Sequence, residues 1–102
     1  MVSNYLVEAP QILRFGPHTT NAGVEFNVQQ NGDSVMWFKV ANGKGTIVVK
    51  FDEERLNGYF GGGDLITCSI PKKFFESPGE HKIYLLDTAT GLTSNIVIFT
   101  VK

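Results

Sequence analysis

The chain has 102 residues, 42% of them hydrophobic, and its nine basic and ten acidic side chains give a formal net charge of −1. This length suits one domain around a single hydrophobic core, and the apolar content excludes a disordered chain. Charges of both signs are interspersed along the sequence, which argues against a nucleic-acid-binding or anionic-membrane-binding protein. We therefore expect a globular domain without a phosphate-binding surface.

The N-terminal stretch, residues 1–9, is interpreted as a lead-in or linker, or as an extra edge strand, before a single domain over residues 10–102. It has no basic flank and no sustained apolar run, so it predicts neither a signal peptide nor a membrane-inserting segment. Two cellular locations of the protein are consistent with this stretch. The protein remains where it is made, or it is one domain of a longer exported chain.

The first half of the domain predicts short strands. Ile12 to Phe15 precedes the breaker pair Gly16-Pro17, and Val24 to Val28 alternates apolar and polar residues as a half-buried strand does. Ser34 to Val40 is apolar on both faces, so the pattern does not tell which face meets the core. Thr46 to Phe51 is a further alternating strand.

Turn residues separate these strands. Asn31-Gly32 and the segment Asn42 to Gly45 are typical of hairpins, and Asp52 to Arg55 predicts a charged turn. Gly61 to Gly63 is too flexible for a strand interior and lies too far from a helix start for a phosphate loop. We expect a mobile tip there, with the adjacent pair Tyr59-Phe60 beside it.

The last third predicts three strands with firm boundaries. Leu65 to Ile70 alternates before Pro71, which has no backbone N–H and ends the strand. Lys72 to Ser77 fits one turn of helix. His81 to Asp87 and Asn95 to Lys102 then form two core strands, with Ile83, Leu85, Val97, Phe99 and Val101 facing inward and the turn at residues 88–91 between them.

The order of these segments resembles that of a bacterial IPT/TIG domain. The resemblance is carried by residues 65–71, Gly79, Ile83, Leu85, Ser94-Asn95 and residues 99–101, with Pro10, Ile12, Gly16-Pro17, Ala22-Gly23, Phe26, Val28, residues 46–51 and Leu56 in step before them. The sequence departs from the family pattern at residues 30–44, which are longer than the usual connection, and at the acidic run Asp52 to Glu54.

The resemblance implies an all-β fold, an immunoglobulin-like β-sandwich of about seven strands. Trp37 is then expected in the core, as in many such sandwiches, and residues 72–77 cross from one sheet to the other. The implied role is a non-enzymatic structural or recognition module. It would belong to a bacterial surface or secreted protein, or to a phage virion as a decoration or tail accessory protein.

Residues for catalysis or metal binding are not predicted. The two histidines, His18 and His81, do not stand at metal-ligand spacing from each other or from the single cysteine, Cys68, and no nucleophile motif is present. Cys68 lies on the apolar side of its strand, which favours a buried, inert thiol. The acids at 52–54 lack the alternating spacing of a calcium loop. We expect no catalytic residue, cofactor or metal.

A possible contact face lies opposite the predicted core. If their neighbours point inward, four apolar side chains of the last two strands point outward: Tyr84, Leu86, Ile96 and Ile98. A monomer rarely leaves an apolar patch of this kind exposed to solvent. Two explanations stay open: the N-terminal residues Tyr5, Leu6 and Val7 cover it, or it binds a protein partner, an adjacent domain or a second copy in a homo-oligomer.

A carbohydrate-binding module is the alternative function. Tyr59 and Phe60 would then form a ligand loop on which sugar rings stack. A DNA-binding role, as in eukaryotic transcription factors with this domain, is disfavoured by the charge.

Overall fold

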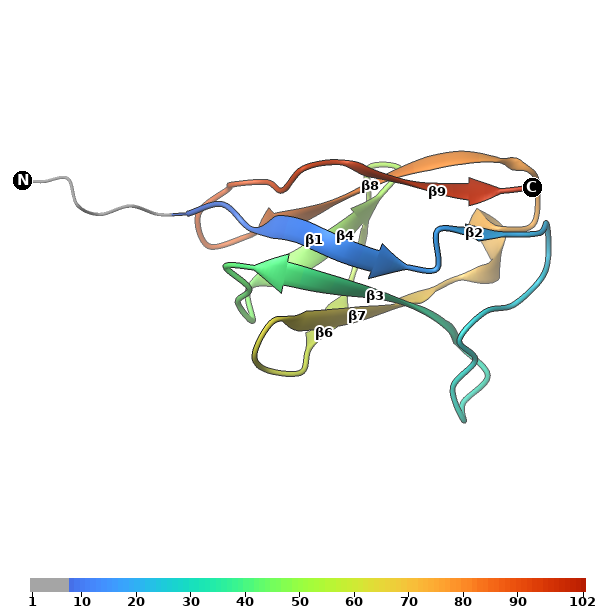
Figure 1. Ribbon diagram of the computed structural model, residues 1–102, viewed down its shortest axis with the longest axis horizontal. Coiled ribbons are helices and arrows are strands. Elements are labelled where there is room, and N and C mark those ends of the chain that lie inside the picture. The colour runs from blue at the N-terminus through green and yellow to red at the C-terminus, as the bar shows by residue number, and fades with distance from the viewer. Residues whose placement is uncertain (1–7) are drawn as a thin grey trace, which may run out of the picture.

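The computed structural model describes residues 8–102, which form two β-sheets packed face to face (Figure 1). Sheet A contains, in spatial order, β1 (Gln11–Gly16), β3 (Ser34–Ala41), β7 (Leu65–Ile70) and β6 (Gly58–Phe60). Sheet B contains β2 (Thr19–Thr20), β9 (Val97–Val101), β8 (Gly79–Asp87), β4 (Ile47–Phe51) and β5 (Glu54–Leu56). This confirms the predicted all-β sandwich, and the layout is consistent with an immunoglobulin-like fold.

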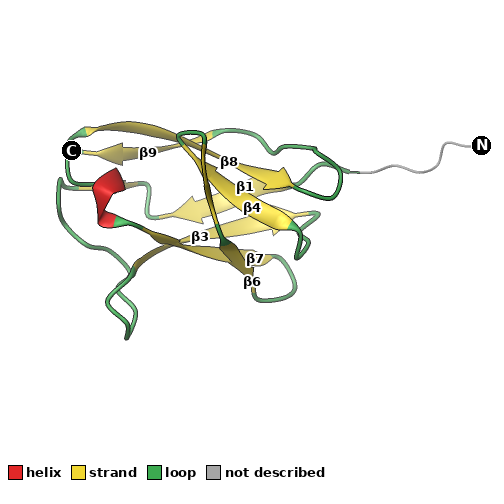
Figure 2. Cartoon of the chain, turned by 180° about the vertical axis from the view of Figure 1, so that it is seen from behind, coloured by secondary structure: helices red, strands yellow, loops and turns green. Residues whose placement is uncertain are grey.

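The chain changes sheet at five connections, β1–β2, β2–β3, β3–β4, β5–β6 and β7–β8. It passes from β1 to β2 at a cis peptide bond between Gly16 and Pro17. It passes from β7 to β8 through η1 (Lys72–Phe74), the short helical turn that the sequence predicts, which lies at one end of the sandwich (Figure 2). The segment Asn42 to Gly45 was expected to close a hairpin, but it joins β3 to β4 in different sheets, so that prediction is wrong.

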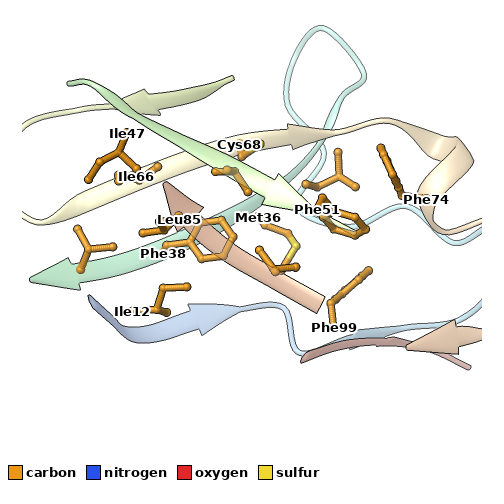
Figure 3. Packing of buried hydrophobic residues seen from close by; sticks show 14 of the residues in the cluster. Ile12, Met36, Phe38, Ile47, Phe51, Ile66, Cys68, Phe74, Leu85 and Phe99 are labelled. Atoms are coloured by element: carbon orange, nitrogen blue, oxygen red, sulfur yellow. The ribbon is translucent and has the colours of Figure 1, made fainter. Parts of the chain in front are cut away.

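The core fills the space between the sheets, where apolar side chains from both meet (Figure 3). Phe38, Phe51, Phe75 and Phe99 are fully buried within it. Complete burial of one such side chain is worth about 1.5–3 kcal/mol, so these rings supply much of the driving force for folding. The other buried apolar side chains are Ile12, Met36, Val40, Ile47, Val49, Ile66, Cys68, Ile70, Phe74, Ile83, Leu85 and Val101.

Trp37 lies outside this core, in contrast to its expected position. Its neighbours Met36 and Phe38 are buried, so the alternation of β3 turns Trp37 to the outer face of sheet A, where it is half-buried. The indole covers Gly16 on β1 so closely that a Cβ there would lie 2.7 Å from the ring. A glycine opposite the tryptophan therefore makes room for the ring on the outer face.

The predicted strand at Val24 to Val28 is absent from the described structure. Val24 and Val28 are 50% and 53% exposed, and the segment is irregular. Phe26 alone packs on the core, while its N–H donates to the Ser34 hydroxyl at 3.2 Å. Asn27 has a φ of 43°, which turns the chain out of the extended conformation. The alternation thus marks one anchoring ring rather than a strand.

The middle of the chain contains two short strands that the sequence analysis did not separate from turns. The charged turn consists of Asp52 and Glu53, both with positive φ, whereas Glu54 already belongs to β5. Tyr59 and Phe60 lie in β6, which pairs with β7, rather than in a loop. Both strands have three residues, too short for a periodic pattern to reveal.

Candidate functional site

The four residues of the predicted contact face lie on or next to the outer side of β8 and β9. Tyr84 and Leu86 alternate with buried residues of β8 and are half-buried, whereas Ile96 and Ile98 are 58% and 39% exposed. The alternative cover of this face, Tyr5 to Val7, lies outside the described residues. The most exposed apolar side chains of the face are thus on the β9 side.

The β8 side of this face is more polar than the sequence pattern implied. Tyr84 lies opposite Lys50 on β4, and its hydroxyl donates to the Glu53 carboxylate at 2.7 Å. This hydrogen bond is the main cause that raises the pKa of Tyr84 above its ordinary value. Ile98 lies opposite Lys82 on β8. Charged side chains therefore bound the apolar face toward β4, and its apolar surface continues toward β9.

A groove lies between β9 and β1, on the side of β9 that faces away from β8. It has a volume of about 510 Å³, and its lining includes Phe15 from β1, Val97 from β9, Trp37 and His18. A volume of roughly 300–1,000 Å³ is typical of ligand sites. Leu13, which also lines the groove, is 56% exposed because a bulge in β1 interrupts the pairing with β3 there. We call this groove, together with Ile96 and Ile98 on either side of its lining residue Val97, the β1–β9 edge.

One end of the groove is closed by Asn95. Its Oδ1 accepts the N–H of Ile12 at 2.8 Å, and its Nδ2 donates to the Ile12 carbonyl at 3.1 Å. The carboxamide thus satisfies both backbone groups of Ile12, as a neighbouring strand would. The other end is closed by His18, whose ring centroid lies 4.4 Å from that of Phe15.

The charge in the groove comes from Arg14, because the described residues that line it include no carboxylate. Its guanidinium offers up to five N–H donors. The imidazole ring of His18 adds two further polar nitrogens to the lining. The groove therefore suits a ligand that is apolar in part and neutral or acidic in its polar groups.

Tyr59 and Phe60, the predicted ligand pair, point to opposite sides of sheet A. Tyr59 is 71% exposed on the outer face, whereas Phe60 packs against the core. The cross-strand register instead aligns Tyr59 with Thr67 on β7, and Thr67 with Trp37 on β3. The aromatic partner of Tyr59 on its face is thus Trp37. The sequence pattern did not reveal this arrangement, because Ser34 to Val40 is apolar on both faces.

Two acidic residues of the run Asp52 to Glu54 have partners within the fold. Asp52 accepts the N–H of Lys82 at 3.0 Å and contacts His81, while Glu54 pairs with Lys73 at 3.1 Å. In residues 8–102, no three His, Cys, Asp or Glu side chains come close enough to hold a metal ion.

The Cys68 thiol is buried in the core, and this burial raises its pKa to about 12. A thiol in this environment remains protonated and is a poor nucleophile. Cys68 is therefore part of the core packing.

No helix within residues 8–102 is long and apolar enough to span a membrane. Comparison with protein-family models and with curated proteins gives no match for this chain.

Proposed function

We propose that this domain is a non-enzymatic structural or recognition module of the IPT/TIG type, which binds a protein partner or an adjacent domain through the β1–β9 edge. The observation that carries the proposal is the exposure of three apolar side chains, Leu13, Ile96 and Ile98, at 56%, 58% and 39%. Leu13 lines the groove, and Ile96 and Ile98 flank Val97, which also lines it. Burying a side chain of this kind contributes about 1.5–3 kcal/mol. A partner that covers all three gains a useful part of its affinity from them.

Two settings fit such a module. In a bacterial surface or secreted protein it would be one of several domains in a row, and on a phage virion it would be a decoration or tail accessory domain. In both settings a domain contacts neighbours in a fixed arrangement. β1 starts at one end of the sandwich and β9 finishes at the other, which suits domains joined end to end (Figure 1).

The test measures solution mass by light scattering across concentration, together with binding of a dye that fluoresces on apolar surfaces. The edge variant carries Ile96→Lys and Ile98→Lys. The control variant carries Val24→Lys and Val28→Lys, which change two similarly exposed side chains in the loop before β3. We expect the edge variant alone to lose most of the dye signal while it stays folded.

The mass then identifies the partner class. A multimer that the edge variant converts into folded monomers makes the partner a second copy, and a monomer that loses dye binding leaves a different protein as the partner. If neither mass nor dye binding differs between the edge variant and wild type, the edge is not an accessible apolar surface and the proposal is wrong.

Carbohydrate binding is a second candidate, favoured by the row Trp37, Thr67 and Tyr59 on the outer face of sheet A. Two aromatic rings with a hydroxyl between them suit the apolar faces and hydroxyl groups of a sugar chain. A glycan array tests this function. Binding that Tyr59→Ala abolishes and Tyr84→Ala, on sheet B, preserves would support it, and an array without specific signals would exclude it.

A further inference from the structure

The first part of β9 has an edge that the described strands leave open. β8 pairs with β9 from Val97 to Val101, whereas β2, on the opposite side, reaches only Thr100 and Val101. The N–H of Thr100 donates to the His18 carbonyl at 3.0 Å, so the backbone of Thr100 points to the β2 side. Backbone direction alternates along a strand. The N–H and C=O of Ile98 therefore point to the same side, beyond the end of β2.

β1 has a matching open position. Within residues 8–102, it is the last strand of sheet A and pairs on one side only, with β3. On β3, the N–H of Val40 donates to the Asp64 carbonyl at 2.8 Å, so Val40 and, by alternation, Phe38 direct their backbone groups away from β1. Phe15 lies opposite Phe38. The N–H and C=O of Phe15 consequently point away from β3, toward the outer edge of sheet A.

Both open positions border the same groove, because Phe15 and Val97 line it from its two sides. β1 and β9 run side by side in the same direction along it, and β2 follows β1 at one end (Figure 1). The open part of β9 therefore lies beside the groove, which Val97 lines. A groove of about 510 Å³ between two strands has room for one extended chain, whereas the flat side of a second sandwich would meet the outward side chains without entering it.

We infer that the β1–β9 edge binds an extended peptide segment, which adds a β-strand in line with β2 and pairs with the backbone of Ile98 or Phe15. This inference rests on the proposed function and names the form of the partner. Main-chain hydrogen bonds give affinity in such strand addition, and pockets for alternate side chains give specificity. Alternate side chains of the segment would enter the groove between Phe15 and Val97. The peptide would therefore alternate apolar residues and carry an acidic residue for Arg14.

The experiment selects octapeptides with apolar residues at alternate positions from a displayed library, using the full chain as bait. The best peptide is synthesised unmodified and in two N-methylated forms, each of which blocks every second backbone N–H. We expect one N-methylated form to bind about tenfold more weakly or worse, and the other to bind like the unmodified peptide. Only pairing along one side of the peptide gives this difference.

Two further measurements locate the pairing. Hydrogen exchange followed by NMR should show the amide of Ile98 or Phe15 slowing by about tenfold or more when the unmodified peptide is bound. Ile98→Pro removes the N–H that points to the groove, and edge strands tolerate proline. Ile98→Thr keeps this N–H and serves as the matched control. Binding should be lost in the first variant and weakened far less in the second, which changes the side chain alone.

The possible failures separate this inference from the proposed function. A selected peptide that binds equally in all three forms, without slower exchange at Ile98 or Phe15, docks by apolar contact alone. That result overturns strand addition and leaves the docking edge in place. Failure of the library to yield any peptide also overturns it, while the dye and mass measurements still decide the proposed function. If Ile98→Pro fails to fold, the N-methylated peptides and the exchange rates decide the result.

Discussion

The side chain of Asn95 takes the place of a neighbouring strand for Ile12, a residue 83 positions earlier in the chain. Its carboxamide accepts from the Ile12 N–H and donates to the Ile12 carbonyl. Ile12 belongs to sheet A, whereas Asn95 lies just before β9 of sheet B. One amide group thus links the edges of both sheets and fixes one end of the groove.

Replacing Asn95 with alanine should destabilise the fold. Asn95→Ala leaves the N–H and carbonyl of Ile12, a buried residue, without their partner, which costs about 1–3 kcal/mol in free energy of unfolding. Denaturant titration measures the change. Asn57→Ala, at an exposed position between β5 and β6, is the control and should cost much less. Equal losses in the two variants would show that the two hydrogen bonds contribute little.

Gly16→Ala should displace the indole of Trp37. The added Cβ would lie 2.7 Å from the ring, too close for any real contact, so the ring must move. Overpacking of this kind costs about 1–3 kcal/mol. Trp37 is the single tryptophan, so its fluorescence spectrum reports the movement directly. Gly45→Ala is the matched control, because its Cβ would meet nothing within 4 Å, and it should leave the spectrum unchanged.

The sequence predicts the strands of the last third well because their alternating pattern fits a half-buried β-strand and no other element. Ile66, Cys68 and Ile70 alternate in front of Pro71, and all three are buried. The segment Val24 to Val28 shows the same alternation but lacks a strand, since Asn27 leaves the extended conformation and Phe26 alone needs burial. Periodicity indicates which side chains are buried in the core. Phe26 packs on the core without the backbone pairing of a β-strand, so the alternation around it does not require a strand.

The candidate site depends on facts that periodicity does not contain. Ile96 and Ile98 could be placed outside the core because Val97 and Phe99 mark the inner face. The groove next to them requires β1 and β9 to be adjacent, a contact between the two ends of the domain that depends on the tertiary fold. Leu13 is exposed through a bulge, and a bulge shifts the alternation by one residue. Local sequence patterns therefore predict the exposed face, but they do not predict the groove.

Asp87 should make the stability depend on acid pH. Its carboxylate accepts hydrogen bonds from the Thr46 hydroxyl at 2.7 Å and the Ala89 N–H at 3.0 Å, and Lys44 lies 3.8 Å away. The Thr46 hydrogen bond is the main cause that lowers the pKa of Asp87, against the opposing effect of burial. A lowered pKa in the folded state stabilises the protein above the unfolded pKa of about 3.9. This contribution is lost as the pH falls through the folded value.

Asp87→Asn tests this dependence. We expect a loss of about 1–3 kcal/mol near neutral pH, because the amide cannot replace all the hydrogen bonds of the carboxylate. The difference from wild type should begin to shrink as the pH falls below the unfolded pKa of about 3.9, and it should be lost below the lowered folded pKa, where the wild-type carboxylate is protonated too. Unfolding curves across pH measure both effects, with Asp64→Asn on the surface as the control. A constant difference at every pH would contradict the assignment.

Cys68 should resist thiol reagents while the protein is folded. The thiol is buried and its pKa is raised to about 12, so almost no thiolate exists near neutral pH. A colorimetric thiol reagent should detect no reaction in native buffer and one thiol per chain in guanidinium chloride, since the sequence has one cysteine. Rapid labelling of the native protein would show that the core opens readily around β7.

The opposite positions of the start of β1 and the end of β9 have a mechanical consequence (Figure 1). A pull on the two ends of the domain draws β1 and β9 apart along their own lengths. The ladders from β1 to β3 and from β9 to β8 lie across this pull, so their hydrogen bonds are loaded together in shear rather than opened one at a time. The Asn95 amide acts as a brace between the two loaded strands. Domains joined end to end in this way would transmit tension along a chain of modules without unfolding at low force.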